Sequence, residues 1–243
     1  MLEVKNLRKR FGDFEAVKGI SFSVQKGEVL GFLGPNGAGK STTMRMVTGF
    51  LPPTSGTAVI CGHDITTDPV GAKKAIGYLP ESAPSYRAMT VEDFLKFIAA
   101  VRGYTGRVAK EKVEQVIEKA KLTKVARQTI ETLSKGYRQR TCFAQAIIND
   151  PKLLIMDEPT DGLDPNQKLV VRQMITDMAK EGKAIIISTH ILEEVDAVCT
   201  KVVVIADGEV KFEGTPAELK AKDPTGANRL DKAFHSLTMK EAL

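Results

Sequence analysis

The sequence predicts an α/β fold: a mostly parallel sheet with an N-terminal antiparallel β subdomain and an inserted α-helical subdomain. Apolar strands alternate with amphipathic helices in the last third of the chain. A glycine-rich run joins a strand to a helix near residue 34, and the middle of the chain has helical periodicity only. Alternation of strand and helix produces parallel strands that helices cover on both faces. The 243 residues suit one large domain or two closely joined lobes.

The first third contains short elements. Residues 2–7 and 20–24 alternate loosely between apolar and polar side chains, which predicts strands. Residues 28–33 are typical of a buried strand, and a helix is expected to start at 41–48. A turn-rich stretch then leads to a short apolar piece at 75–79.

The middle of the chain predicts helices. Val91, Phe94, Leu95 and Ile98 recur at helical spacing, and Thr90 precedes them as a candidate cap. The same spacing recurs over 113–120, and a further helix is expected over about 136–148. Residues from about 82 to 150 therefore form an inserted helical subdomain, and residues 1–81 and 151–243 form the core of the same single domain.

The last third alternates again. Residues 153–156 and 184–188 are apolar strands, and Asp164-Pro165 caps and starts a helix between them. Residues 202–205 and 209–212 are expected to form a hairpin across Asp207-Gly208.

Composition indicates an ordinary globular protein, with 42% hydrophobic and 27% charged residues. No apolar stretch is long enough to cross a bilayer, and the first residues lack the features of a secretory signal. The three cysteines have no metal-ligand spacing, which favours reduced thiols in the cytosol. The net charge of +5 is mild. The basic residues at 5–10 have no interleaved aromatics, which favours a solvated strand over a nucleic-acid site.

The most informative motif is the run GPNGAGKST, which fits the pattern G-x-x-x-x-G-K-[ST] of P-loop nucleoside triphosphatases. Glycines let successive backbone N–H groups converge on phosphate oxygens, and the following helix N-terminus favours an anion. The alternative, an accidental glycine-rich turn, fits poorly with the flanking strand and helix. The residues expected to bind nucleotide here are Gly34, Pro35, Asn36, Gly37, Ala38, Gly39, Lys40, Ser41 and Thr42.

Asp157, Glu158 and His190 are expected to complete the site around Lys40 and Ser41. Lys40 would reach the β- and γ-phosphates, and the Ser41 hydroxyl would ligate Mg²⁺. The strand at 153–156 ends in Asp157, a candidate Mg²⁺ ligand, and Glu158, a candidate base for the attacking water. His190 follows another strand, where ligands bind in parallel sheets, so we expect it to contact the γ-phosphate rather than serve the core.

At this point the sequence resembles the ATP-binding-cassette (ABC) ATPases over essentially its whole length. Residues 133–140, LSKGYRQR, are similar to the signature of that family and precede Asp157-Glu158, as they do there. Residues 160–164 resemble the loop after the second motif, and residues 188–190 resemble the strand end that carries the switch histidine.

The resemblance implies a head-to-tail dimer, homomeric or heteromeric, in which each ATP lies between the phosphate loop of one subunit and the signature of the other. It further implies that an aromatic residue near the N-terminus stacks on adenine, here Phe11 with Val17 beside it. The further nucleotide-binding residues that it implies are Ser134, Lys135, Gly136, Tyr137 and Asp164.

The chain departs from the family pattern at three positions. Lys135 adds a positive charge to the signature, and Tyr137 replaces the usual amide. Glu81 stands where glutamine is usual, and its carboxylate is expected to approach Mg²⁺ or the attacking water.

The Pro80-Glu81 pair, the signature and the following motif are most similar to the export-type, gliding-motility-like branch. We therefore expect an ATP hydrolase subunit that powers a separate integral-membrane permease from the cytoplasmic face of the cell membrane, without nucleic acid. Residues 82–99 would dock the permease, with Tyr86 at the surface and Phe94 in the core. The alternatives are a soluble ABC ATPase of iron–sulfur, ribosome or DNA systems and a regulatory module without turnover.

Overall fold

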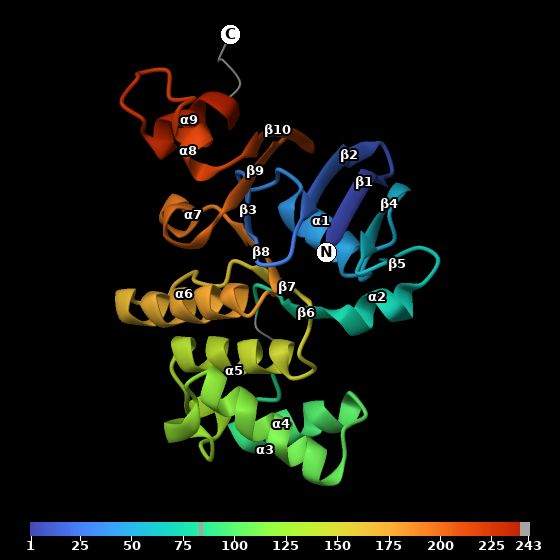
Figure 1. Ribbon diagram of the computed structural model, residues 1–243, viewed down its shortest axis with the longest axis vertical. Coiled ribbons are helices and arrows are strands. Elements are labelled where there is room, and N and C mark those ends of the chain that lie inside the picture. Colours follow the sequence, from blue (N-terminus) through green and yellow to red (C-terminus); the bar gives the residue numbers. More distant parts are fainter. Residues whose placement is uncertain (83–84, 239–243) are drawn as a thin grey trace.

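The computed structural model describes residues 1–82 and 85–238, which form two β-sheets and a group of helices beneath them (Figure 1). The N-terminal sheet is antiparallel and has the strand order β2-β1-β4-β5. Its strands are β1 (Leu2–Phe11), β2 (Phe14–Val24), β4 (Ser55–Ile60) and β5 (His63–Asp64).

The second sheet has the order β10-β9-β3-β8-β7-β6. Its strands are parallel except β10, which pairs antiparallel with β9 at the edge. This confirms the mostly parallel sheet and the antiparallel N-terminal subdomain. Its strands are β3 (Val29–Leu33), β6 (Ile76–Leu79), β7 (Leu153–Asp157), β8 (Ala184–Thr189), β9 (Lys201–Ala206) and β10 (Glu209–Gly214).

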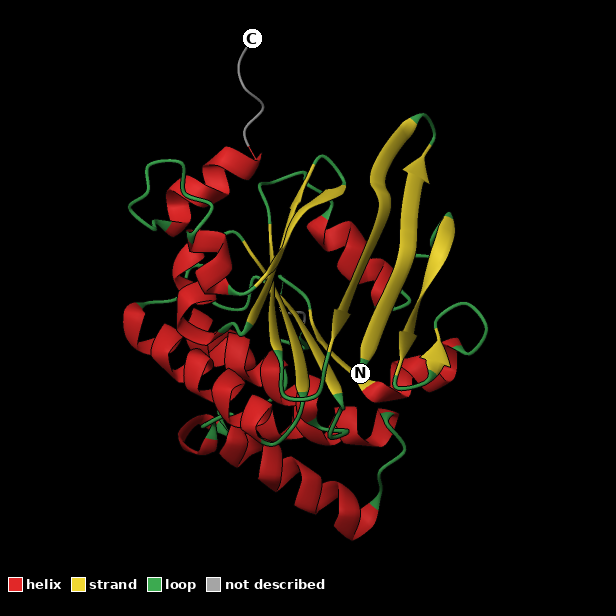
Figure 2. Cartoon of the chain, turned by 45° about the horizontal axis from the view of Figure 1, so that its top comes forward, coloured by secondary structure: helices red, strands yellow, loops and turns green. Residues whose placement is uncertain are grey.

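Helix α1 (Lys40–Val47) lies between the two sheets, as Figure 2 shows. Its buried residues Met44, Met46 and Val47 share one apolar cluster with side chains of both sheets. The loop that connects β3 to α1 is therefore held from two sides by core packing. Burying apolar surface contributes about 25 cal/mol per Å² to the free energy of folding, so this cluster stabilises the position of α1 and of the loop before it.

The helices around residues 91–147 form a separate group at the end of the molecule away from the N-terminal sheet (Figure 1). Val91, Phe94 and Leu95 are buried there, as their spacing predicts. The same cluster continues under the second sheet, so this subdomain packs directly on the core. Its helices are α3 (Val91–Val101), α4 (Gly106–Lys119) and α5 (Lys135–Ile147), with 3₁₀ turns at Thr123–Val125 and Ile130–Thr132.

The remaining helices pack against the second sheet, except the helix at Pro69–Ala75, which contacts β4 and β5 of the N-terminal sheet as well as β6. Asp164 caps α6, as predicted, and accepts a hydrogen bond from Gln167 N at 3.0 Å. Within the described residues, no helix is both long and apolar enough to cross a membrane. These helices are α2 (Pro69–Ala75), α6 (Pro165–Lys180), α7 (Leu192–Val198), α8 (Pro216–Lys220) and α9 (Leu230–Thr238).

Several elements differ from the sequence prediction. The first two strands are longer than the expected 2–7 and 20–24, and together they form a hairpin that ends at Phe11 and Phe14. Strand β4 occupies part of the stretch that was expected to be turns only. It forms because its backbone pairs with β1, which local periodicity does not reveal.

Candidate functional site

The loop between β3 and α1 is shaped for close backbone approach. Gly37 and Gly39 have φ values of 80° and 104°, a region that side chains with a Cβ rarely adopt. A Cβ on Gly39 would lie 2.7 Å from the Ala16 carbonyl oxygen, whereas a Cβ on Gly37 would meet open space. Gly39 is therefore required by the packing of β2 against the loop, and Gly37 by its backbone conformation.

Lys40 is a buried cation inside this loop, with 7% of its surface exposed. Its Nζ donates to the carbonyl oxygens of Gly34, at 2.7 Å, and Pro35, at 3.2 Å. Burial lowers the pKa of Lys40, and the nearby carboxylates of Glu158, Asp157 and Glu81 partly oppose that effect. An anion next to Nζ would favour the charged form, so the site is electrostatically suited to a phosphate.

Glu158 lines the site beside His190, and its backbone conformation is unusual. It follows the buried strand β7 with a φ of 49°, which is uncommon for a residue other than glycine, and its N–H donates to Ser188 O at 2.8 Å. Its Oε1 lies 2.9 Å from His190 Nδ1, and the Thr189 hydroxyl donates to Oε2 at 3.3 Å. Because a carboxylate can only accept, the histidine nitrogen is the donor.

Asp157 fits a cation site. It is buried, and its Oδ1 has no hydrogen-bond partner among the described residues; neither has the buried Ser188 hydroxyl. Buried polar atoms are normally paired, so this carboxylate oxygen is suited to a cation or a water molecule. No group of three or more His, Cys, Asp or Glu in residues 1–82 and 85–238 could hold a metal alone. Mg²⁺ here would share its ligands with phosphate oxygens.

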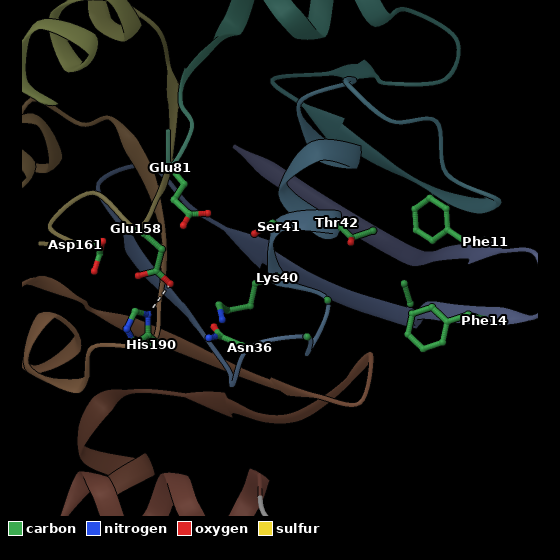
Figure 3. A pocket seen from close by; sticks show the side chains of 13 residues that line it. Phe11, Phe14, Asn36, Lys40, Ser41, Thr42, Glu81, Glu158, Asp161 and His190 are labelled. Atoms are coloured by element: carbon green, nitrogen blue, oxygen red, sulfur yellow. Dashed lines mark hydrogen bonds and ion pairs between the residues drawn. The ribbon is translucent and has the colours of Figure 1, made fainter. Parts of the chain in front are cut away.

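Lys40, Glu158 and His190 line one cavity of about 450 Å³ (Figure 3), whereas the buried Asp157 is not among its lining residues. Lys40, Glu81 and Glu158 point into it from three different segments, and His190 borders it beside Glu158. The structure thus brings together side chains that are far apart in sequence. The predicted site residues that line the cavity are Phe11, Asn36, Gly37, Gly39, Lys40, Ser41, Thr42, Glu81, Glu158 and His190.

The signature residues lie elsewhere and contact their own chain. Ser134 caps α5 and accepts from Tyr137 N at 3.4 Å. The Lys135 ammonium is 3.4 Å from the carboxylate of Asp161, a cavity-lining residue. A Cβ on Gly136 would lie 2.6 Å from Gln167 Oε1. None of the residues 133–137 is among those that line the cavity of their own chain.

Val17, expected beside Phe11 at the base, is not among the residues that line the cavity. It is fully buried in the apolar cluster around α1, and its neighbour Ala16 lines the cavity in its place. Asp164 also lies outside the lining and serves as the cap of α6. Sequence reasoning missed Phe14, Ala16 and Asp161. The alternation of β2 after the Gly12-Asp13 turn is the signal that could have indicated Phe14.

Residues 17–161 match the model of the ABC transporter family. The chain belongs to that family. It is 36% identical over 219 residues to Nod factor export ATP-binding protein I of Ralstonia nicotianae, which covers 90% of this chain and 68% of the relative. It is also 36% identical over 244 residues to the probable multidrug ABC transporter ATP-binding protein YbhF of Escherichia coli. That match covers 98% of this chain but only 41% of YbhF, so the chain spans about two-fifths of that relative.

A solved structure agrees with the family assignment. The ATP-binding subunit of an ABC transporter matches 98% of this ABC chain and 100% of its own, with a TM-score of 0.87 and 28% sequence identity. The two folds therefore correspond over essentially their whole length, including the β subdomain and the helical insertion.

Proposed function

We propose that this chain is an ATPase subunit that binds MgATP and hydrolyses it at an interface between two copies, to drive a membrane permease. The observation that carries the proposal is the convergence on one cavity of a buried Lys40 and a Glu158 carboxylate held by His190. The choice of ATP as the nucleotide rests on the family, because the relatives and the solved structure are named as ATP-binding proteins or subunits.

The proposed chemistry follows from the positions of the side chains. The loop N–H groups and Lys40 would bind the β- and γ-phosphates of ATP and hold them in place. Glu158 would accept a proton from the attacking water, and its hydrogen bonds with His190 and Thr189 would fix the direction of its lone pairs. His190, half-exposed beside that carboxylate, would also contact the γ-phosphate.

Ser41 and Asp157 are the side chains that would hold Mg²⁺. The unpaired Oδ1 of the buried Asp157 supports that role, and Glu81, from the loop after β6, lines the same cavity as Ser41. The metal, when bound, would neutralise charge on the phosphate oxygens. Glu81 adds a negative charge where a glutamine would be neutral, so it would strengthen metal binding and oppose the phosphates.

The second half of the site would come from another copy of the cassette. Ser134, Lys135, Gly136 and Tyr137 do not line their own cavity, and the N-terminus of α5 is exposed at Lys135. A helix N-terminus with an added ammonium is suited to a phosphate. The proposal is a head-to-tail dimer in which this surface closes over the ATP bound by the partner.

The proposed partner is an integral-membrane permease, and the proposed location is the inner face of the cell membrane. Residues 82–99 are the docking candidate, although residues 83 and 84 lie outside the described part of the chain. Tyr86 is exposed and packs edge-on against Phe97, with ring centroids 5.3 Å apart, while Phe94 is buried. The names of the relatives refer to transporters, and one of them to export, which favours this partner and direction over the soluble alternatives.

The test is the Glu158→Gln variant of the full chain. Because a glutamine cannot accept the proton, we expect steady-state ATP hydrolysis to fall at least about 100-fold. Binding of MgATP should persist, since the phosphate loop is unchanged. Phosphate release and nucleotide binding by isothermal titration calorimetry measure the two effects separately.

Glu114→Gln is the matched control, because Glu114 is an exposed glutamate on α4 outside the cavity. It should hydrolyse ATP at the parental rate. Parental hydrolysis by Glu158→Gln would show that Glu158 is not the base, and absent MgATP binding by the parent chain would refute the proposed function.

A further inference from the structure

Phe14 is an exposed aromatic ring at the edge of the proposed nucleotide cavity. It begins β2, and 66% of its surface is exposed; Phe11, which ends β1, is 48% exposed. The two residues are direct partners across the antiparallel hairpin. Side chains that face each other in this way project from the same side of the sheet. The end of the hairpin therefore presents two rings on one face.

Both rings line the cavity that contains the phosphate loop (Figure 3). Phe14 also lines a neighbouring cavity of about 470 Å³, together with Gly37 of the phosphate loop and the turn at Gly208. Phe14 therefore borders two cavities, and both of them reach Gly37 of the phosphate loop. A base attached to a phosphate in the loop would extend toward this hairpin.

The backbone that carries Phe14 is fixed relative to the phosphate loop. The Ala16 carbonyl oxygen is so close to Gly39 and Gly208 that a Cβ on either would lie 2.7 or 2.8 Å from it. Lys18 N donates to Gly208 O at 2.8 Å, and Gly208 N donates to Ala38 O at 3.1 Å. The start of β2 is thus clamped between the loop and the β9–β10 turn. This preorganises the backbone that carries the ring, which reduces the cost of binding.

The surroundings of the two rings differ. Lys9 Nζ lies 5.2 Å from the centroid of the Phe11 ring, which already has a cationic neighbour. Within residues 1–82 and 85–238, no aromatic ring or cation is paired with Phe14. A large ring that is mostly exposed, beside a cavity, is suited to a planar apolar ligand.

We propose that Phe14 is a nucleotide-binding residue that contacts the base of the bound nucleotide, so that base recognition uses both rings of the hairpin rather than Phe11 alone. The inference rests on the proposed function, because that function puts a nucleoside phosphate in the loop. Contact with a ring face recognises any base by stacking and gives no contact to a ligand that lacks a base.

The experiment compares MgADP with Mg-pyrophosphate, which has no base, by calorimetry on the full chain. Stacking of a base on an aromatic ring is worth about 1–3 kcal/mol, so Phe14→Ala should weaken MgADP binding about 5- to 150-fold. Pyrophosphate affinity should stay within about twofold of the parent, as twofold is about 0.4 kcal/mol. Phe14→Leu keeps an apolar side chain without a ring and should resemble Phe14→Ala.

Phe50→Ala is the matched control, since Phe50 is 78% exposed and is not among the cavity-lining residues. It should bind both ligands like the parent. MgADP affinity unchanged in Phe14→Ala but lost in Phe11→Ala would overturn the proposal, and so would equal losses for both ligands, which would show that Phe14 shapes the loop. If the parent binds neither ligand, the proposed function fails and this inference with it.

Discussion

The phosphate loop and the signature stretch differ in how the fold holds them. The loop at 34–42 lies between two sheets, with Lys40 buried and its ammonium bonded to the loop's own carbonyl oxygens. The signature at 133–137 begins α5, a largely buried helix whose start is exposed at Ser134 and Lys135, and its Lys135–Asp161 ion pair has both side chains about half exposed. The first region is complete within one chain, whereas the second presents polar groups and a helix N-terminus outward.

This difference suggests that the phosphate loop binds the nucleotide and that the signature serves the association of two copies. A preorganised loop can bind nucleotide in a monomer, because its shape depends only on packing inside the chain. In the proposed head-to-tail dimer, the signature would act on the ligand that the other copy binds. Changes in the loop should therefore abolish nucleotide binding itself, while changes in the signature should affect only the association of two nucleotide-loaded copies.

The largest expected effect is on the loop. Lys40→Met keeps the apolar stem but removes the charge, so it deprives the phosphates of a charge-assisted hydrogen bond worth about 1.5–3 kcal/mol. MgATP affinity measured by calorimetry should fall about 10- to 100-fold or more. Lys119→Met, on the surface of α4 with its ammonium 2.8 Å from Glu181, is the control and should bind normally. Unchanged affinity in Lys40→Met would contradict the assignment of the loop.

The smallest expected effect is on the signature lysine. Lys135 and Asp161 are about half exposed, and such pairs are worth about 0–1 kcal/mol, so neither Lys135→Ala nor Asp161→Asn should unfold the chain. Because we expect Lys135 to act on the partner's phosphate, Lys135→Ala should leave MgATP binding by the monomer unchanged and weaken ATP-induced association severalfold.

Asp161→Asn separates the two roles that Lys135 could have. If Lys135 only holds the loop at Asp161, both variants should weaken association equally in sedimentation experiments. A larger loss with Lys135→Ala would support direct contact with phosphate. Equal losses would restrict Lys135 to positioning the loop within its own chain.

The sequence predicted those parts of the site that depend on local pattern. The glycine-rich run, the strand that ends at Asp157 and the position of His190 after β8 each follow from a motif or from an apolar strand next to it. Parallel strands bring their carboxyl ends to one edge, which explains why these separate segments meet at one cavity. The family resemblance was needed for the signature, for Phe11 and Val17, for Asp164 as a nucleotide-binding residue and for Glu81.

The part of the cavity that the β1–β2 hairpin lines was harder to predict, because it depends on the register between these two strands. Strand β1 pairs with β2 through several irregularities, one of them between Lys9 and Arg10, and these change which side chains share a face. Val17 is therefore buried, while Ala16 and Phe14 reach the cavity. A period of two read along the sequence cannot locate such shifts, which are set by the pairing between strands.

The most direct test of the account is the mass of Glu158→Gln in solution with and without MgATP, measured by sedimentation equilibrium. The account predicts a monomer without nucleotide and a dimer in millimolar MgATP, because the uncleaved γ-phosphate joins the phosphate loop of one copy to the signature of the other. Adding Ser134→Arg, which places a bulky side chain at that contact, should restore the monomer while MgATP still binds. A Glu158→Gln chain that binds MgATP and stays monomeric would contradict the account.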